Sequence, residues 1–184
     1  RKILAENFNA GEKWLVYCDS AQQMSDIAES LDSLNISSSF YHSRMHDLEK
    51  EQALKHFKIN GGILLSIKCL DEGVDIPSIT HALIVSSDQN PRQFVQRRGR
   101  VLRRDPLNSG KKKAYIWDII LPVGDSSADS SLIKGLCIAE LKRSIEFSRY
   151  SFNIEISAKK LRDIARRARV THEDLEYCLE DIEE

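Results

Sequence analysis

The regular alternation of short apolar runs with segments of helical periodicity constrains the fold of this 184-residue chain more than any other feature. The predicted strands cover residues 14–18, 38–42, 63–66, 82–86 and 114–121. Between them, apolar side chains recur every three or four residues, which is the spacing of one face of a helix. Strands that are largely apolar and alternate with helices are typical of a parallel sheet covered by helices on both faces. The sequence therefore predicts an α/β fold.

Two helix starts can be placed from local signals. Ser20 with Gln23 three residues later has the spacing of a capping box, and apolar residues repeat at helical intervals from Met24 onward. Asp47 is the predicted cap of a second helix, which carries the apolar residues Leu48, Leu54 and Phe57. The glycine pair at 61 and 62 is predicted to break the chain before the third strand.

The character of the chain changes near residue 126. Residues 124–131 read Gly-Asp-Ser-Ser-Ala-Asp-Ser-Ser, a composition typical of a linker. Beyond them, helical patterns cover residues 132–149 and 161–168, and Thr171 with Asp174 has the spacing of a cap for a last helix. We therefore predict a sheet domain over residues 1–125 and a C-terminal helical extension over residues 126–184. We expect these helices to pack on the sheet or on a partner.

Charge is concentrated locally, because the formal net charge of the chain is only −1. Residues 92–113 carry six arginines and three lysines against one acid, Asp105, whereas residues 173–184 are acidic and contain no lysine or arginine. A local basic surface is what a chain with no overall positive charge would use to meet a polyanion. The two stretches could also pair with each other.

The four cysteines are widely spaced and form no C-x-x-C pair, so we expect neither a metal site nor a disulfide framework. The five histidines form no ligand spacing either. A reduced, cytoplasmic setting is the default for such a chain. No apolar run reaches membrane-spanning length, and we expect no membrane partner. The sequence begins at Arg1 in the middle of a pattern and shows no signal peptide, so we expect a piece of a longer protein.

Two tryptophans and one histidine are predicted to belong to the sheet itself. Trp14 and Trp117 lie in predicted strands, and we interpret them as core residues rather than base-stacking platforms. His81 stands at the head of a strand, where we expect it to be packed or hydrogen-bonded.

Polar segments follow most of the predicted strands. In an open parallel sheet, ligands bind beside the carboxyl ends of the strands. The segments after residues 18, 42, 66 and 86 all leave from that edge, so we expect their polar side chains to converge there. The sequence contains no G-x-x-x-x-G-K-[ST] phosphate loop, and the glycine pair at 61 and 62 lacks that context. A nucleotide could therefore be contacted by this chain but hardly enclosed by it.

Four motifs stand in a characteristic order: Tyr-Cys-Asp-Ser at 17–20, Tyr-His-Ser-Arg at 41–44, Leu-Asp-Glu-Gly-Val-Asp-Ile-Pro at 70–77, and Gln-Arg-Arg-Gly-Arg-Val-Leu-Arg at 96–103. In this order they resemble the motifs of the second RecA-like domain of superfamily 2 helicases. The similarity is closest to DEAD/DEAH-type DNA helicases and the helicase subunits of restriction systems. It covers about residues 10–122, and the last two motifs are its most specific part.

The resemblance implies that ATP with Mg²⁺ binds between two RecA-like domains, of which this is the second. An N-terminal RecA-like domain would supply the phosphate loop, so this piece alone should hardly hydrolyse ATP. Arg100 and Arg103 match the arginine fingers, which neutralise charge on the transferred phosphoryl group. Gln96 matches the polar residue that opens the motif. Gly73 would allow close backbone approach, and Asp75 would reach the ribose or the fingers. Alternatively, Gly73 ends a turn and Asp75 caps one.

The resemblance also implies a grip on the backbone of one nucleic-acid strand. The candidates carry hydroxyls and cations, which suit phosphates without reading sequence: Ser20, Ser43, Arg44, Ser66 and Lys68. The chain departs from the family pattern at Ile67, where threonine or serine is frequent, and at Gln52, where arginine is frequent. Each candidate could equally be an ordinary loop or capping residue.

These observations predict the C-terminal motor domain of an ATP-dependent helicase or translocase that acts on DNA rather than RNA. Two other functions stay open. One is a non-catalytic nucleic-acid-binding module that uses the basic surface at 92–113. The other is an adaptor that docks a partner through the helices from residue 132 onward.

Overall fold

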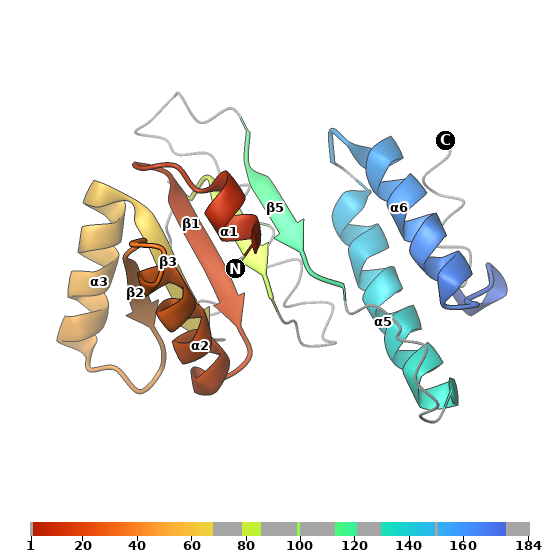
Figure 1. Cartoon of the computed structure of the whole chain (residues 1–184), viewed down its shortest axis with the longest axis horizontal. Helices are drawn as coiled ribbons and strands as arrows, with labels where there is room; N and C mark the ends of the chain where they lie inside the picture. Colours follow the sequence, from red (N-terminus) through yellow and green to blue (C-terminus); the bar gives the residue numbers. More distant parts are fainter. Residues whose placement is uncertain are drawn as a thin grey trace. The chain divides into compact units, whose positions relative to one another are not determined.

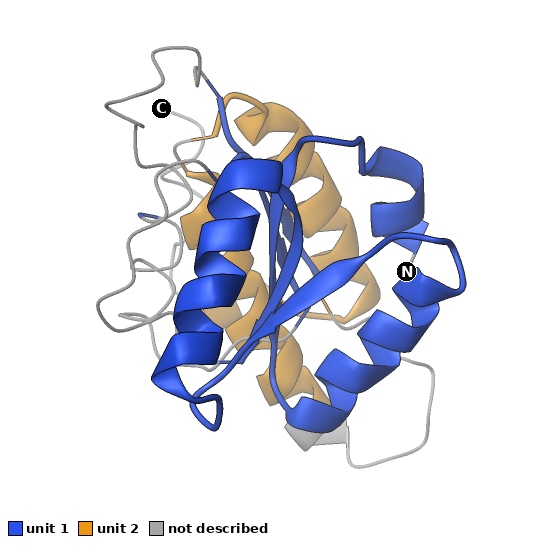
Figure 2. Cartoon of the chain, turned by 90° about the vertical axis from the view of Figure 1, so that its left-hand side faces the viewer, with its two compact units in different colours: residues 1–88, 95–119 blue, residues 89–94, 120–184 orange. Residues whose placement is uncertain are grey.

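The computed structural model describes residues 2–67, 79–85, 99, 113–120, 130–149 and 151–175. The chain divides into two compact units (Figure 2), one formed by residues 1–88 with 95–119 and the other by residues 89–94 with 120–184. The predicted boundary between residues 125 and 126 lies outside the described residues.

The first unit contains a five-stranded parallel sheet, in which the strands stand in the order β2-β3-β1-β4-β5 (Figure 1). The strands are β1 (Lys13–Cys18), β2 (Ser38–Tyr41), β3 (Gly62–Ile67), β4 (His81–Ile84) and β5 (Tyr115–Asp118). All four pairings are parallel. The predicted α/β fold with a parallel sheet is confirmed.

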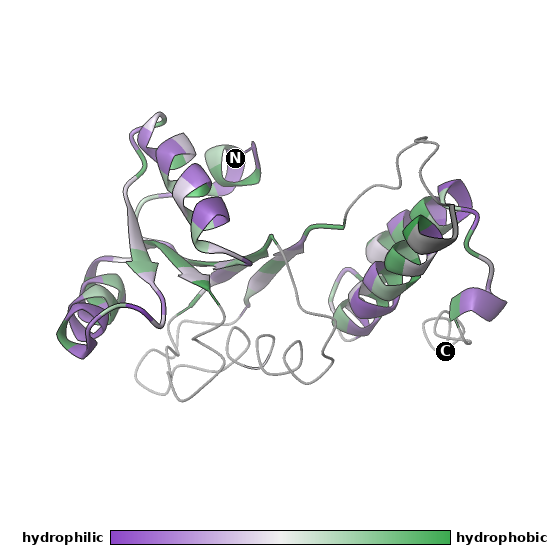
Figure 3. Cartoon of the chain, turned by 90° about the horizontal axis from the view of Figure 1, so that it is seen from below, coloured by the Kyte–Doolittle hydropathy of each residue, from purple (hydrophilic) through white to green (hydrophobic). Residues whose placement is uncertain are grey.

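The path of the chain explains why helices cover both faces of the sheet. From β1 the chain moves outward to β2 through α2 (Ala21–Asp32), and it returns to β3 through α3 (Asp47–Asn60). Crossovers between parallel strands are right-handed, so an outward and a returning connection place their helices on opposite faces. Figure 3 shows α2 on one side of the sheet and α3 on the other.

One face of the sheet packs against α2 and the short helix α1 (Lys2–Asn7). Alternate residues of β1 point to this face, because side chains alternate along a strand. The buried cluster consists of Leu4, Trp14, Val16, Cys18, Met24, Ala28, Leu31, Ile63, Leu65 and Leu83. The sequence did not predict α1, since its six residues are too few to show a helical period.

Helix α2 begins where the capping signal predicted. Ser20 is the N-cap residue, and its Oγ accepts a hydrogen bond from the Gln23 backbone N–H at 3.2 Å. The Gln23 side chain bonds back to the N–H of Asp19 at 2.9 Å, one residue earlier than in a standard capping box. The hydroxyl of Ser20 therefore has a structural task at the start of the helix.

Helix α3 corrects one prediction. Asp47 is its first residue rather than its cap, and His46 is the N-cap, with its backbone N–H donating to Glu49 Oε2 at 2.9 Å. Leu48 is 66% exposed, whereas Phe57 is buried. Nine residues separate these two side chains, which turns them to opposite sides of a helix with 3.6 residues per turn. Leu48 therefore does not share the buried face with Phe57.

The glycine pair forms the tight corner between α3 and β3. Gly61 has φ +73°, and a Cβ at this position would lie 2.8 Å from the carbonyl oxygen of Glu12. Gly62 also has a positive φ, and its N–H donates to the same oxygen at 2.7 Å. Only a residue without a side chain fits this approach of two backbones.

The second unit contains α5 (Ser130–Ser148), α6 (Ile154–Arg167) and the short 3₁₀ helix η2 (Glu173–Leu175). Its buried cluster comprises Cys137, Leu141, Ile145, Leu161, Ala165, Val170 and Leu175. Thr171 and Asp174 bond reciprocally before η2: Asp174 Oδ2 accepts from the Thr171 N–H at 2.7 Å, and Thr171 Oγ1 accepts from the Asp174 N–H at 3.3 Å. None of the helices in the described part is long and apolar enough to cross a membrane.

Candidate functional site

The carboxyl ends of three neighbouring strands form one edge of the sheet. In the register, Tyr41 at the end of β2 pairs with Ser66 of β3, and Ser66 pairs with Tyr17 of β1. Ser20 follows β1 by two residues, and the Ser43-Arg44 segment follows β2 by two residues. The fold therefore brings together the segments that carry four of the predicted nucleic-acid-binding residues.

Three of these residues are exposed at the edge: Ser20, Ser43 and Arg44. Ser20 also starts a helix of 12 residues whose first turn carries no acid. A helix N-terminus presents unpaired backbone N–H groups and a partial positive charge, which favours anions. Hydroxyls, a guanidinium and a helix N-terminus are the groups that bind phosphate without reading a base.

Ser66 differs from the other three residues. Its exposed fraction is 0%, and its Oγ has no hydrogen-bond partner among the described residues. A side chain in the middle of a parallel sheet is covered by its neighbours on both sides. In this arrangement the Ser66 hydroxyl is closed off from any ligand at the surface.

His42 is a residue that the sequence reasoning did not assign to this edge. It follows β2 directly and precedes Ser43, and it is half-buried. Its Nδ1 atom is buried without a hydrogen-bond partner among the described residues. In the sequence it stands at the end of a predicted strand and within the motif at 41–44, but neither position sets it apart from its neighbours.

The remaining predicted site residues lie outside the described residues. They are the nucleic-acid candidate Lys68 and the nucleotide candidates Gly73, Asp75, Gln96, Arg100 and Arg103. Within the arginine motif, only Gly99 is described, and it is exposed.

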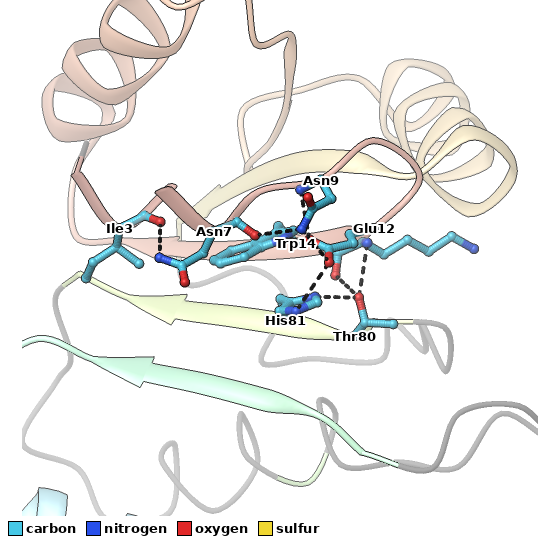
Figure 4. Close-up of polar contacts among 8 residues, drawn as sticks. Ile3, Asn7, Asn9, Glu12, Trp14, Thr80 and His81 are labelled. Atoms are coloured by element: carbon cyan, nitrogen blue, oxygen red, sulfur yellow. Dashed lines mark hydrogen bonds and ion pairs between the residues drawn. The ribbon is translucent and has the colours of Figure 1, made fainter. Parts of the chain in front are cut away.

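A second group of polar side chains lies at the amino ends of the strands, and these side chains interact with one another (Figure 4). Glu12 Oε2 accepts a hydrogen bond from Trp14 Nε1 at 2.8 Å, and Thr80 Oγ1 lies 2.7 Å from His81 Nδ1. The rings of Trp14 and His81 stack with centroids 4.6 Å apart, and the ring of Tyr115 stacks on His81 with centroids 5.0 Å apart. Trp14 is fully buried and His81 is 8% exposed, which confirms both predictions.

Burial and bonding set the protonation of this amino-edge group. Burial lowers the pKa of His81 below its ordinary value, although the nearby charge of Glu12, 3.8 Å from Nε2, acts in the opposite direction. Burial alone would raise the pKa of Glu12, but hydrogen bonds from Trp14 and Asn9 and the charge of His81 lower it. A lowered pKa favours the neutral imidazole of His81 and the ionised carboxylate of Glu12.

Cys18 ends β1 close to the carboxyl edge, but its thiol is buried, and burial raises its pKa to about 12. A thiol with such a pKa is not a nucleophile at neutral pH. Within residues 2–67, 79–85, 113–120, 130–149 and 151–175, no three histidine, cysteine, aspartate or glutamate side chains gather in a way that could hold a metal ion.

Residues 1–105, more than half of the chain, match the family described as the helicase conserved C-terminal domain. The chain belongs to this family. The chain is 31% identical over 113 residues to the XPB helicase/translocase subunit of transcription and DNA repair factor IIH from Enterocytozoon bieneusi. The matched region covers 60% of the chain and 18% of the relative. The chain is 32% identical over 111 residues to DEAD-box ATP-dependent RNA helicase 31 from Oryza sativa subsp. japonica, which covers 60% of the chain and 20% of the relative.

Solved structures show the same fold. The C-terminal domain of the DEAD-box protein Dbp5 superposes with a TM-score of 0.53 at 14% identity, over 73% of this chain and 74% of that one. The yeast DEAD-box splicing factor Prp28 gives a TM-score of 0.56 at 18% identity, over 73% of this chain and 28% of that one. The resemblance to the second RecA-like domain of superfamily 2 helicases is therefore confirmed. The chain spans a fifth or less of the curated relatives that it matches.

Proposed function

We propose that this chain is the C-terminal motor domain of an ATP-dependent helicase or translocase. The observation that carries this is the exposed carboxyl edge of the sheet, where Ser20, Ser43 and Arg44 follow neighbouring strands in a chain that belongs to the helicase C-terminal family. These residues hold the backbone of a nucleic-acid strand by its phosphates. ATP binding and hydrolysis in the complete protein move this grip relative to a second motor domain.

The nucleotide half of this function depends on the arginine motif. The family match extends to residue 105 and so includes Arg100 and Arg103, which supports their assignment as arginine fingers. In this assignment Gln96 links the motif to the phosphates, while Gly73 and Asp75 lie against the nucleotide. Mg²⁺ and the phosphate loop come from an N-terminal RecA-like domain. This chain alone then contacts ATP without hydrolysing it.

Substitution of Arg100 in the complete protein tests this assignment. A guanidinium that neutralises charge in the transition state is worth about 10³ to 10⁵ in rate, so Arg100→Ala should lower kcat by about that factor. ATP affinity should change by only a few fold. Arg100→Lys should also lose most of the activity, because an ammonium lacks the planar fork of donors. The matched control is Lys55→Ala, which removes an exposed cation from α3. Normal ATPase activity in Arg100→Ala would overturn the finger assignment.

DNA is the nucleic acid that we propose, on the likeness of the motifs to those of DNA helicases. Relatives named for RNA and for DNA both match the chain, so the substrate needs its own measurement. ATPase stimulation should be compared for single-stranded DNA, duplex DNA and RNA of the same sequence and length. Stronger stimulation by RNA than by either DNA would reverse the choice. Steeply salt-dependent binding with no ATPase activity at all would favour the non-catalytic binding module instead.

We also propose a cytoplasmic setting. The buried thiols of Cys18 and Cys137, both free cysteines, fit a reducing compartment.

A further inference from the structure

Helix α6 lies beside α5 (Figure 1). It has one buried and one exposed face. The buried face consists of Ala158, Leu161 and Ala165, and the last two belong to the cluster shared with Leu141 and Ile145 of α5. The side chains on the opposite side of α6 are therefore directed to solvent. The helical pattern at 161–168 indicated this helix, but no function was predicted for its exposed side.

The exposed side of α6 and its C-terminal end are basic. Six exposed cations lie within 11 residues, and we define them as the α6 cationic face: Lys159, Lys160, Arg162, Arg166, Arg167 and Arg169. The helix carries two acidic residues, which are Glu155 in its first turn and Asp163 further along. Asp163 pairs with Arg166 at 3.4 Å. Lys159, Lys160 and Arg167 make no ion pair with any other residue in the described ranges.

The spacing of these cations follows the helix axis. Lys159 and Arg166 lie seven residues apart and so form one row, two turns long. Lys160 and Arg167 form a second row beside it. Each row spans about 10.5 Å at a rise of 1.5 Å per residue. One strand of a duplex places a phosphate about every 3.4 Å along its axis, so a row of this length faces about three phosphates.

The acidic end of the chain is the competing partner within the molecule. Of its two described carboxylates, Glu173 is exposed and makes no ion pair with a described residue. Asp174 is bound elsewhere, since Lys134 of α5 lies 2.7 Å from its Oδ2 and Thr171 bonds to the same atom. That acid is thus paired with α5 and not with the α6 cationic face. A partner with regularly spaced negative charges fits the two rows better than a few acidic side chains do.

We propose that the α6 cationic face is a second nucleic-acid contact, which binds the phosphate backbone outside the parallel sheet. This deepens the proposed function and depends on its nucleic-acid part. Long, exposed lysine and arginine side chains bind phosphates electrostatically and read no sequence. The face adds affinity and strand-holding, and it takes no part in ATP hydrolysis.

Salt dependence of binding in the complete protein measures the number of phosphates that the face contacts. The double variant Lys159→Gln with Arg166→Gln removes one row, and Lys55→Gln with Lys58→Gln on α3 is the control with the same change of charge. Affinities for single-stranded and duplex DNA, and for RNA, are measured without nucleotide between 50 and 200 mM salt. Each lost phosphate contact lowers the salt slope by about 0.7 on single strands and about 0.9 on duplex.

On single strands, the salt slope of the α6 double variant should be smaller than that of the parent by about 1.4, which is about 0.7 for each of the two lost contacts. The control should keep the parent slope. Across this salt range the affinity of the α6 double variant relative to the parent should therefore shift about sevenfold. An unchanged slope in the α6 variant would overturn the inference. A higher affinity would also overturn it, because that result means that the acidic end of the chain occupies the face.

The second nucleic-acid contact and the motor function are tested by different measurements, so one can fail without the other. Loss of ATPase activity in Arg100→Ala together with an unchanged slope in the α6 variant leaves the motor assignment intact and removes the second contact. A reduced salt slope in the α6 variant of a protein that has no ATPase activity supports the second contact and removes the motor assignment. Basal ATPase activity of the α6 variant, measured without nucleic acid, should equal that of the parent, because these exposed side chains lie outside the matched residues 1–105.

Discussion

The two edges of the sheet use polar residues in opposite ways. At the amino edge, Glu12, Trp14, Thr80 and His81 bond or stack with one another (Figure 4). At the carboxyl edge, Ser43 and Arg44 are exposed, and the polar atoms Ser66 Oγ and His42 Nδ1 are buried with no hydrogen bond to a described residue.

This difference separates stability from binding within one sheet. Buried polar groups in proteins are almost always hydrogen-bonded, and a set that satisfies itself rigidifies the structure around it. Polar groups that stay exposed, such as those of Ser43 and Arg44, can interact with a ligand. We therefore expect substitutions at the amino edge to affect unfolding, and exposed substitutions at the carboxyl edge to affect nucleic-acid binding.

Trp14→Ala should have the largest effect. Trp14 is fully buried, stacks on His81 and Trp117 and donates to Glu12, so its removal leaves a cavity and takes one hydrogen bond from the Glu12 carboxylate. Loss of a buried Trp costs about 3–5 kcal/mol of unfolding free energy. Urea unfolding followed by circular dichroism measures it. The control Tyr115→Ala removes a half-exposed ring from the same stack and should cost much less. Equal losses in both variants would contradict the importance of the buried stack.

Ser66→Ala tests whether the buried hydroxyl has a partner. An unsatisfied buried group costs about 1–3 kcal/mol, so its replacement by a methyl group should raise the free energy of unfolding by about 1 kcal/mol. The measurement is the same urea titration. A loss of stability would mean that the hydroxyl is bonded by residues outside the described part, and Ser66 would then belong with the satisfied groups of the sheet.

Two substitutions at Ser20 separate its cap from its proposed phosphate contact. Ser20→Ala removes the acceptor for the Gln23 N–H and should cost about 1 kcal/mol. Ser20→Asp keeps an acceptor and should restore that stability. Its negative charge should at the same time weaken binding of single-stranded DNA, which fluorescence anisotropy measures. Binding as strong as in the parent protein would place Ser20 outside the nucleic-acid contact.

His81 should make stability depend weakly on pH, the smallest of these effects. Burial lowers its folded pKa below the ordinary 6.5, so its stabilising contribution is complete above that pH and is lost as the pH falls through the lowered value. Glu12 acts only below its own ordinary value of 4.5, because its pKa is lowered as well. Urea midpoints at pH 7.5 and 5.5 should therefore differ more in the parent than in His81→Gln. An identical difference in both proteins would show that other groups titrate.

Much of the fold could be predicted because its signals are local. The apolar strand at 14–18, the cap at Ser20 and the break at Gly61 and Gly62 each depend on a few neighbouring residues, and the structure confirms them. Errors arose where a local pattern was ambiguous. Asp47 was predicted to cap α3, but it is the first residue of the helix, and His46 is the N-cap.

The candidate site was predicted less completely. The order of the motifs indicated which segments matter, and the sheet does bring the ends of β1, β2 and β3 to one edge. The sequence could not show that Ser66 is buried while Ser43 is exposed, because the burial of a serine depends on its tertiary neighbours and not on its residue type. The position of His42 Nδ1 depends on the same packing.

By itself the sequence determined the alternation of strands and helices, the parallel sheet and the helicase family, because periodicity and motifs are properties of residues close together in the chain. Tertiary structure alone decided which neighbours each strand has, which hydroxyl is buried and which side of α6 faces solvent. Burial depends on residues far apart in sequence, such as the pairing of Tyr17 with Ser66 or the packing of Leu161 with the cluster around Leu141. Long-range contacts of this kind leave no local pattern to read.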